Sequence, residues 1–198
     1  MNETAKPRFL LLLSLLLGLL AAACSPAAAP PLEGAKMGGP FTLTAEDGRT
    51  VTEKDFAGRY RIVYFGFTHC PDICPTDLAT IGQALRLFEE EHPKRAEKVQ
   101  PLFVTVDPER DTPEQMARYT SSFHPRILGL TGTPEQIADA AKKHGIYYAK
   151  GEAQPGGGYP VDHTRVVVLY GTEGEPIALL PYEQGAEAVA AELARWVR

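Results

Sequence analysis

A short run of β-forming residues leads directly into a pair of cysteines, and this junction constrains the fold more than any other part of the chain. The segment from Arg61 to Gly66 is almost continuously apolar, which is the pattern of a strand buried on both faces of a sheet. Cys70 and Cys74 follow at once, and apolar residues then recur at helical spacing from Thr76 to about Glu91. The sequence therefore predicts a strand, a two-cysteine turn and a helix in succession.

The rest of the chain alternates between strand and helix patterns. Further strands are expected at 99–106, 127–130, 147–148, 165–170 and 176–180, helices from Pro113, from Pro134 and over 185–197, and a hairpin over 41–52. Thr112 and Thr133 precede the two prolines and are typical helix caps. This order predicts an α/β fold with a mixed central sheet flanked by helices and an N-terminal hairpin. In a thioredoxin-like fold, a redox pair lies directly after the first buried central strand.

The N-terminus has the pattern of an export signal. Residues 1–23 combine basic residues with an apolar run of the length found in signal peptides, and Cys24 follows as in a lipoprotein signal, where this cysteine is lipidated. A plain cleaved signal or an uncleaved transmembrane anchor are the alternatives. Residues 24–40 are expected to be a flexible tether and 41–198 a single domain. We expect a lipid-anchored protein in the periplasm, on the outer face of a bacterial cytoplasmic membrane.

Charge and cysteine usage narrow the function. Removal of Lys6, Arg8 and Glu3 with the signal reduces 20 basic and 25 acidic residues to 18 and 24, a net charge of −6. No basic cluster is present, so nucleic acid is not expected as a partner. Only Cys70 and Cys74 remain in the domain, and the small loop between them would constrain the unfolded chain little. The pair is therefore expected to carry chemistry.

The spacing of the two cysteines permits metal binding and disulfide chemistry alike. If the helix begins at Pro71, residues i and i+4 place both sulfurs on one face, with Cβ atoms about 5–6 Å apart. A helix N-terminus lowers the pKa of a thiol and so favours thiolate, which is both the metal-binding and the attacking form. Thiolates select copper(I), zinc or iron–sulfur. Two sulfurs are too few for most stable metal sites, so a third ligand is expected.

Histidines are the candidates for that third ligand. His163 comes just before the Val-rich strand that starts near Arg165, where a loop could face the cysteine helix, whereas His69 adjoins Cys70 and could point away. Three others lie at helix ends and are expected to be solvated or capping residues: His92, His124 and His144. Two acidic residues remain open: Asp72 either tunes a cysteine pKa or caps the helix, and Asp162 either hydrogen-bonds His163 or is a solvated turn residue.

Three segments together resemble the SCO/SenC family of cytochrome c oxidase assembly proteins. They are Gly66-Phe-Thr-His-Cys-Pro-Asp-Ile-Cys-Pro75, Val106-Asp-Pro-Glu-Arg-Asp-Thr-Pro113 and Val161-Asp-His-Thr164, and the resemblance extends over residues 37–198. It implies a thioredoxin-like fold that binds one copper ion, as Cu(I) or Cu(II), through Cys70, Cys74 and His163.

The same resemblance implies the partners. Family members act on the dinuclear copper centre of cytochrome c oxidase subunit II, by delivering copper or by reducing the cysteines of that subunit. Another periplasmic copper carrier or a thiol reductant is a further expected partner. In the second segment, we expect Asp107 to end a strand and Arg110 to pair with Asp111 in a long turn, the alternative being a partner surface.

Two classes of function therefore remain open. A metallochaperone, which is not an enzyme, needs Cys70, Cys74 and His163, whereas a thiol–disulfide oxidoreductase needs the redox pair Cys70 and Cys74 alone. A peroxidase would share the fold, but it would lack a distant resolving cysteine once Cys24 is lipidated. A copper sensor is a further alternative.

Overall fold

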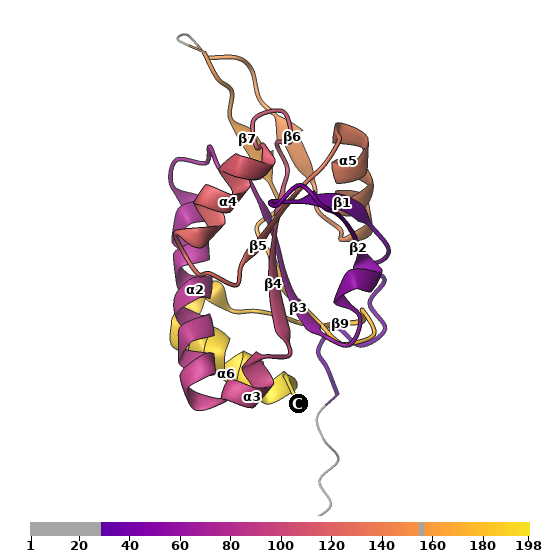
Figure 1. The fold of residues 1–198 in the computed structure, drawn as a ribbon, viewed down its shortest axis with the longest axis vertical. Helices are drawn as coiled ribbons and strands as arrows, with labels where there is room; N and C mark the ends of the chain where they lie inside the picture. Colours follow the sequence, from indigo (N-terminus) through magenta and orange to yellow (C-terminus); the bar gives the residue numbers. More distant parts are fainter. Residues whose placement is uncertain (1–28, 155–156) are drawn as a thin grey trace, which may run out of the picture.

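The computed structural model describes residues 29–154 and 157–198, and its centre is a seven-stranded sheet (Figure 1). The strand order is β2–β1–β5–β4–β3–β8–β9. The parallel strands are β3 (Tyr60–Gly66), β4 (Val99–Thr105) and β5 (Leu128–Thr131). Antiparallel strands complete it on both sides: β1 (Thr42–Ala45), β2 (Thr50–Thr52), β8 (Val167–Tyr170) and β9 (Pro176–Leu179). The predicted mixed sheet and the N-terminal hairpin are confirmed.

Helices cover both faces of this sheet. They are α2 (Ile73–Glu91), α3 (Pro93–Ala96), α4 (Pro113–Ser121), α5 (Pro134–Lys143) and α6 (Ala186–Trp196), with 3-10 turns η1 (Glu53–Phe56) and η2 (Tyr182–Gln184). Figure 1 shows α2, α4 and α6 on one side and α5 on the other. The crossovers β3–α2–β4 and β4–α4–β5 run in the same direction, so their common handedness places α2 and α4 on one face.

The end of β3 positions the cysteine pair. Tyr64 and Phe65 on β3 and Phe103 on β4 are at most 2 % exposed, so a packed aromatic core fixes the carboxyl ends of these two strands. The chain leaves β3 at Gly66 and enters α2 at Ile73. The predicted succession of strand, cysteine turn and helix is therefore correct, although the helix begins earlier than Thr76.

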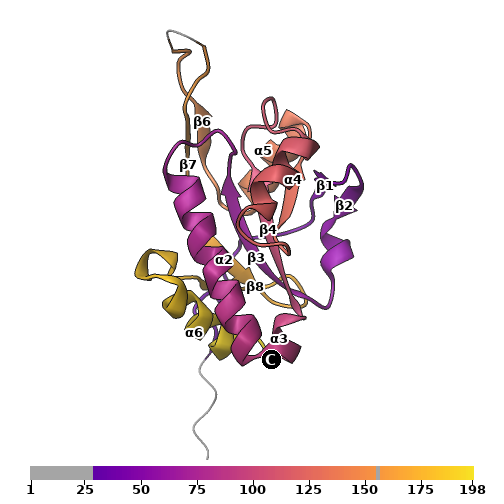
Figure 2. The same cartoon turned by 60° about the vertical axis from the view of Figure 1, so that its left-hand side comes forward.

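Two strands form a second, smaller sheet. β6 (Tyr148–Lys150) and β7 (Val161–His163) pair in antiparallel fashion, with Tyr148 opposite His163. Figure 2 shows them extending beyond the end of the main sheet, beside the start of α2. His163 was expected just before a strand, but it is itself the last residue of β7. This position brings it to the same end of the molecule as the cysteines.

The first described residue, residue 29, lies after the predicted signal. Residues 1–23 and Cys24 lie outside the described residues. Residues 29–40 differ from the expected flexible tether, because the Leu32 N–H donates to Ile177 O (3.0 Å) and the Gly38 N–H to Lys143 O (2.8 Å). Leu32 and Met37 also pack against the core. Within the described ranges, no helix is both long and apolar enough to cross a bilayer.

Candidate metal and thiol site

Cys70 and Cys74 lie on either side of the first residue of α2. Cys74 is the second residue of the helix and is completely buried, whereas Cys70 is half-buried in the turn before it. The condition that the helix begins at Pro71 is not met, because α2 begins at Ile73 and the backbone of Asp72 (φ −140°, ψ −58°) is not helical. The Cys74 N–H instead donates to Cys70 Sγ (3.4 Å). The Cys70 sulfur thus satisfies one of the free N–H groups at the helix start.

Gly66 makes room for the buried sulfur. A Cβ at this position would lie 3.1 Å from Cys74 Sγ and 2.8 Å from Cε2 of Phe103. Both separations are shorter than an ordinary van der Waals contact of about 3.5–4.0 Å. The glycine that ends β3 is therefore part of the site, since it lets Cys74 lie directly against the strand.

His163 meets the buried cysteine from the second sheet. Its Nε2 lies 3.5 Å from Cys74 Sγ, and its Nδ1 lies 3.1 Å from Thr164 O. A carbonyl oxygen only accepts hydrogen bonds, so Nδ1 carries the proton and Nε2 presents its lone pair to the sulfur. Burial lowers the pKa of His163, which keeps the imidazole neutral at pH 7. A neutral imidazole with a free Nε2 is the form that binds metals.

The buried thiol is not the activated group that the sequence predicted. Burial raises the pKa of Cys74 to about 12, and this effect outweighs the backbone hydrogen bond of Phe67, which lowers the pKa. The expectation of a lowered pKa is wrong for Cys74 because the prediction did not include its complete burial. In the metal-free protein Cys74 is therefore a neutral thiol, and a bound cation must displace its proton.

The separation between Cys74 and His163 fits a shared metal ion. Bonds of about 2.3 Å to sulfur and about 2.0 Å to nitrogen at a tetrahedral angle place the two donors about 3.5 Å apart. The observed separation is 3.5 Å. Without a metal, the same geometry permits a hydrogen bond from the thiol to Nε2. Sulfur and imidazole donors together suit copper or zinc.

His69 does not belong to this group. Its Nδ1 contacts Thr68 Oγ1 (3.1 Å) and Asp111 Oδ1 (3.4 Å), and its side chain is 42 % exposed. Asp111 is completely buried, and its carboxylate also accepts hydrogen bonds from the Thr68 N–H and from the hydroxyl groups of Thr68 and Thr105. Protein donors already surround this carboxylate, so the contacts of His69 and Asp111 form a network separate from the thiols.

The second sequence segment holds the β6–β7 region in place. Arg110 pairs with Asp107 and not with Asp111, so the expected Arg110–Asp111 pair is wrong: the buried Asp111 carboxylate faces the threonines instead. The Tyr159 hydroxyl donates to Asp107 (2.7 Å), and the Arg110 guanidinium stacks on the Tyr159 ring at 3.8 Å. The structural interpretation of this segment is therefore the one that its contacts support.

The remaining histidines divide between solvent and core. His92 is partly exposed, but His124 and His144 are 2 % and 5 % exposed, so these two are not solvated. His144 is the C-cap residue of α5, which fits the capping alternative. His144 contacts Ala140 O through Nδ1 (2.8 Å) and packs against Phe65 at 5.4 Å between ring centroids. Both lie at helix ends, as predicted, but those ends face the protein interior.

The two open acidic residues do not contact the thiols. Asp72 lies at the start of α2, where its side chain makes no capping hydrogen bond. Asp162 is exposed, while the Nδ1 of His163 faces the Thr164 carbonyl. The solvated interpretation of Asp162 is therefore the one that fits.

Sequence reasoning missed a buried carboxylate beside the site. Asp77 is 4 % exposed and accepts hydrogen bonds from the Tyr64 hydroxyl (2.7 Å) and from Arg165 Nη2 (3.0 Å). The signal was present, because Asp77 comes three residues after Cys74 and directly before Leu78, on the apolar face of the helix.

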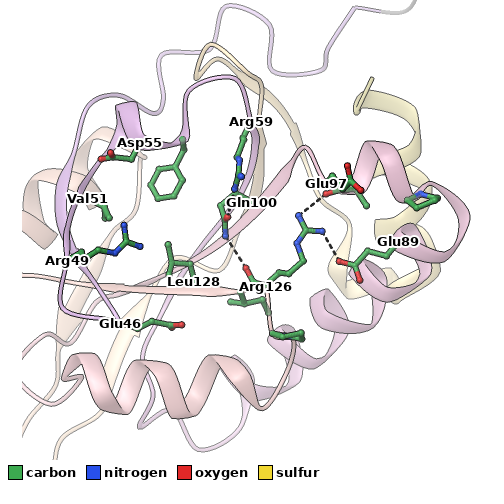
Figure 3. A pocket seen from close by; sticks show the side chains of 15 residues that line it. Glu46, Arg49, Val51, Asp55, Arg59, Glu89, Glu97, Gln100, Arg126 and Leu128 are labelled. Atoms are coloured by element: carbon green, nitrogen blue, oxygen red, sulfur yellow. Dashed lines mark hydrogen bonds and ion pairs between the residues drawn. The ribbon is translucent and has the colours of Figure 1, made fainter.

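A large open pocket lies at the other end of α2. It measures about 930 Å³ and is bordered by Glu89 near the end of the helix and by Gln100 at the start of β4 (Figure 3). Arg126 pairs with Glu89 at 2.8 Å, and Gln100 donates to Arg126 O at 3.0 Å. None of the described residues that line it is a cysteine or a histidine. Among its described lining residues, this pocket therefore offers neither a sulfur nor an imidazole donor.

Relatives of known name match most of the chain. The Arabidopsis thaliana protein named "SCO1 homolog 1, mitochondrial" is 44 % identical over 73 % of this chain and 42 % of its own length. The Homo sapiens protein named "SCO1 homolog, mitochondrial" is 38 % identical over 82 % of this chain and 53 % of its own length. The chain thus spans about half the length of the curated relatives that it matches.

Those names correct the predicted location. The relatives from Arabidopsis thaliana, Bos taurus, Homo sapiens and Saccharomyces cerevisiae are all named as mitochondrial proteins. The expectation of a lipid-anchored protein on a bacterial membrane is contradicted by them, and they point to mitochondria instead. That expectation rested on residues 1–24, which lie outside the described residues.

Solved structures agree with the fold. The structure of Bradyrhizobium japonicum ScoI with copper bound superposes with a TM-score of 0.73 at 39 % identity, covering 81 % of this chain and 99 % of the other. Yeast Sco1 with copper bound gives 0.75 at 38 % identity, covering 82 % and 88 %. The thioredoxin domain of a thiol–disulfide oxidoreductase from Bacteroides vulgatus, at 0.56 and 15 % identity over 89 % of this chain and all of that domain, shows the shared thioredoxin-like fold. The family described as SCO1/SenC matches residues 29–198. The chain therefore belongs to the SCO1/SenC family.

Proposed function

We propose that the protein binds one copper ion through Cys70, Cys74 and His163. The observation that carries this proposal is the 3.5 Å separation between Cys74 Sγ and a His163 Nε2 whose lone pair is free. Cys70 Sγ lies at the start of the same helix, 3.4 Å from the Cys74 N–H, and can supply the third donor. Copper in solved relatives supports the choice of metal. Two sulfurs favour Cu(I), and an imidazole also accommodates Cu(II).

The copper is a cargo that the protein delivers to the dinuclear copper centre of cytochrome c oxidase subunit II. The solved protein BsSco is described as a member of the Sco family of cytochrome c oxidase assembly proteins. This description supports an oxidase partner. The three donors differ in access, because Cys74 is buried whereas Cys70 is half-buried and Ile73 between them is 40 % exposed. An incoming ligand of the acceptor would therefore first replace Cys70, and Cys74 and His163 would hold the ion until the exchange is complete.

Reduction of the acceptor's cysteines is the second candidate function. Cys70 and Cys74 are both free thiols, and Cys70 Sγ accepts a hydrogen bond from the Cys74 N–H, so the two residues lie close together at the start of α2. In this reaction Cys70 attacks the disulfide of the acceptor, which forms a mixed disulfide and releases one acceptor thiol. Cys74 then attacks Cys70 Sγ and releases the second acceptor thiol. The acceptor gains two thiols, and the protein is left with a Cys70–Cys74 disulfide, so two electrons and two protons are transferred.

One experiment separates delivery from reduction. Copper-loaded protein and reduced metal-free protein are mixed separately with the metal-free copper domain of subunit II, and the absorption of the copper centre and the acceptor thiols are followed in parallel. Delivery predicts that copper absorption appears only with the loaded protein and is lost in His163→Ala. Reduction predicts new acceptor thiols with the metal-free protein, and His163→Ala retains them. His92→Ala is the matched control, because His92 lies at the far end of α2. If neither signal appears, both proposals are wrong.

A further inference from the structure

An ion pair joins the two segments that carry Cys74 and His163. The Asp77 carboxylate accepts from Arg165 Nη2 at 3.0 Å through one oxygen and at 3.2 Å through the other, and from Arg165 Nε at 3.4 Å. The Tyr64 hydroxyl donates to the same carboxylate at 2.7 Å. The Asp77 side chain is 5 % exposed and that of Arg165 is 36 % exposed. The contact is thus a bidentate pair anchored on a buried carboxylate.

The pair spans the same gap as the contact between the cysteine and the histidine. Asp77 comes three residues after Cys74 on α2, so the two side chains are neighbours on one helix face. Arg165 comes two residues after His163 and directly after Thr164, whose carbonyl accepts a hydrogen bond from His163 Nδ1. The Tyr64 ring also meets the His163 ring edge-on, with centroids 6.4 Å apart. A shift of Arg165 would therefore move the Thr164 carbonyl and the imidazole together.

We propose that Asp77 and Arg165 are positioning residues that hold His163 against Cys74 with its Nε2 toward the sulfur. This rests on the proposed copper site, because it assigns a role to residues behind that site. The pair acts through the Thr164 peptide, which fixes both the orientation of the ring and the nitrogen that carries the proton. Groups that fix a ligating histidine in this way typically change metal affinity by about 10-fold to 100-fold when they are removed.

Arg165 is the better residue to substitute in a test of this pair, because substitution of Asp77 would also disturb the fold. Substitution of Asp77 would leave Tyr64 and Arg165 without an acceptor in a buried environment and would destabilise the fold itself. Arg165→Gln removes the charge at a partly exposed position. Arg165→Lys keeps the charge but loses the two-pronged geometry. Arg49→Gln is the matched control, since Arg49 is 69 % exposed and pairs with Asp47 in the β1–β2 turn.

Two measurements test the role of the pair. Copper(I) affinity is measured by competition with a chelator in the wild type, Arg165→Gln, Arg165→Lys and Arg49→Gln, and each of the first three also in a His163→Ala background. The rate of Cys74 alkylation is measured by mass spectrometry in the metal-free proteins. We expect Arg165→Gln to weaken copper binding about 10-fold to 100-fold, Arg165→Lys to weaken it less, and Arg49→Gln to match the wild type. Alkylation of Cys74 should be faster in Arg165→Gln because His163 no longer covers the sulfur.

The His163→Ala background separates positioning from a general loss of stability. If Arg165 acts through His163, its substitution has no further effect on affinity once the imidazole is gone. An equal loss in both backgrounds would overturn the proposal, and so would unchanged affinity together with unchanged alkylation in Arg165→Gln. Wild-type protein without His163-dependent copper binding would instead refute the proposed function. In that case the alkylation of metal-free protein still decides whether Arg165 holds His163 over Cys74.

Discussion

Replacement of Gly66 by alanine tests how tightly the buried thiol is packed against β3. The new methyl group would lie 2.8 and 3.2 Å from two ring atoms of Phe103 and 3.1 Å from Cys74 Sγ. Phe103 and Cys74 are both 0 % exposed, so neither can move into solvent. Overpacking of this kind costs about 1–3 kcal/mol, and the lower backbone entropy of alanine in the unfolded chain returns about 0.5–1 kcal/mol. We therefore expect a net loss of roughly 1–2 kcal/mol.

Urea denaturation of the metal-free protein measures this loss directly. In a separate thermal unfolding experiment, the melting temperature should fall by about 2–8 °C for a chain of this size. Copper affinity should fall as well, because the Cys74 sulfur is pushed out of line with His163. The double variant with Phe103→Leu is the control: leucine lacks the ring atoms nearest to the added methyl group, so the two substitutions together should cost less than their sum. A Gly66→Ala protein as stable as the wild type would refute the packing argument.

Two further predictions concern stability away from the site. Burial lowers the pKa of His144 in the folded protein, so the unfolded chain binds a proton first as the pH falls below about 6.5. Folding stability should therefore decrease between pH 7.5 and 5.5, and less steeply in His144→Gln, where only the other buried histidines contribute. Thr133 accepts the Gln136 N–H at 3.3 Å and its own N–H donates to Gln136 Oε1 at 2.8 Å, so Thr133→Ala should cost about 1 kcal/mol in urea denaturation.

A specific experimental outcome would contradict each of these two predictions. Identical slopes of unfolding free energy against pH in the wild type and His144→Gln would show that His144 is protonated equally in both states. For the cap, Thr133→Ser is the matched control, because it keeps the hydroxyl and should behave as the wild type. A Thr133→Ala protein of unchanged stability would show that the capping box contributes nothing to α5.

Much of the fold follows from local patterns in the sequence. The run from Arg61 to Gly66 forms β3 within one residue, and the threonine caps before Pro113 and Pro134 mark the starts of α4 and α5 correctly. These signals work because they depend on neighbouring residues only. The pairing of β6 with β7 was not predicted, since the two short strands are separated by a glycine-rich loop. Strands of three residues leave little trace in periodicity.

The sequence predicted the residues of the proposed site, but it did not predict their physical state. The sequence pointed to Cys70, Cys74 and His163, and the structure brings the last two within 3.5 Å. The charge state of Cys74 was not predictable, because burial depends on how α2 packs against β3 and β4. Asp77 and Arg165 were missed for the same reason: an ion pair between residues 88 positions apart becomes visible only when β7 lies beside the start of α2.

The most direct test of the proposed site is a count of the donor atoms around bound copper. X-ray absorption of the copper(I)-loaded protein should show two sulfur donors and one imidazole in the wild type. His163→Ala should lose the imidazole and keep both sulfurs, and His69→Ala should be indistinguishable from the wild type, because His69 faces Thr68 and Asp111. An unchanged spectrum in His163→Ala, or loss of the imidazole in His69→Ala, would contradict the proposed site.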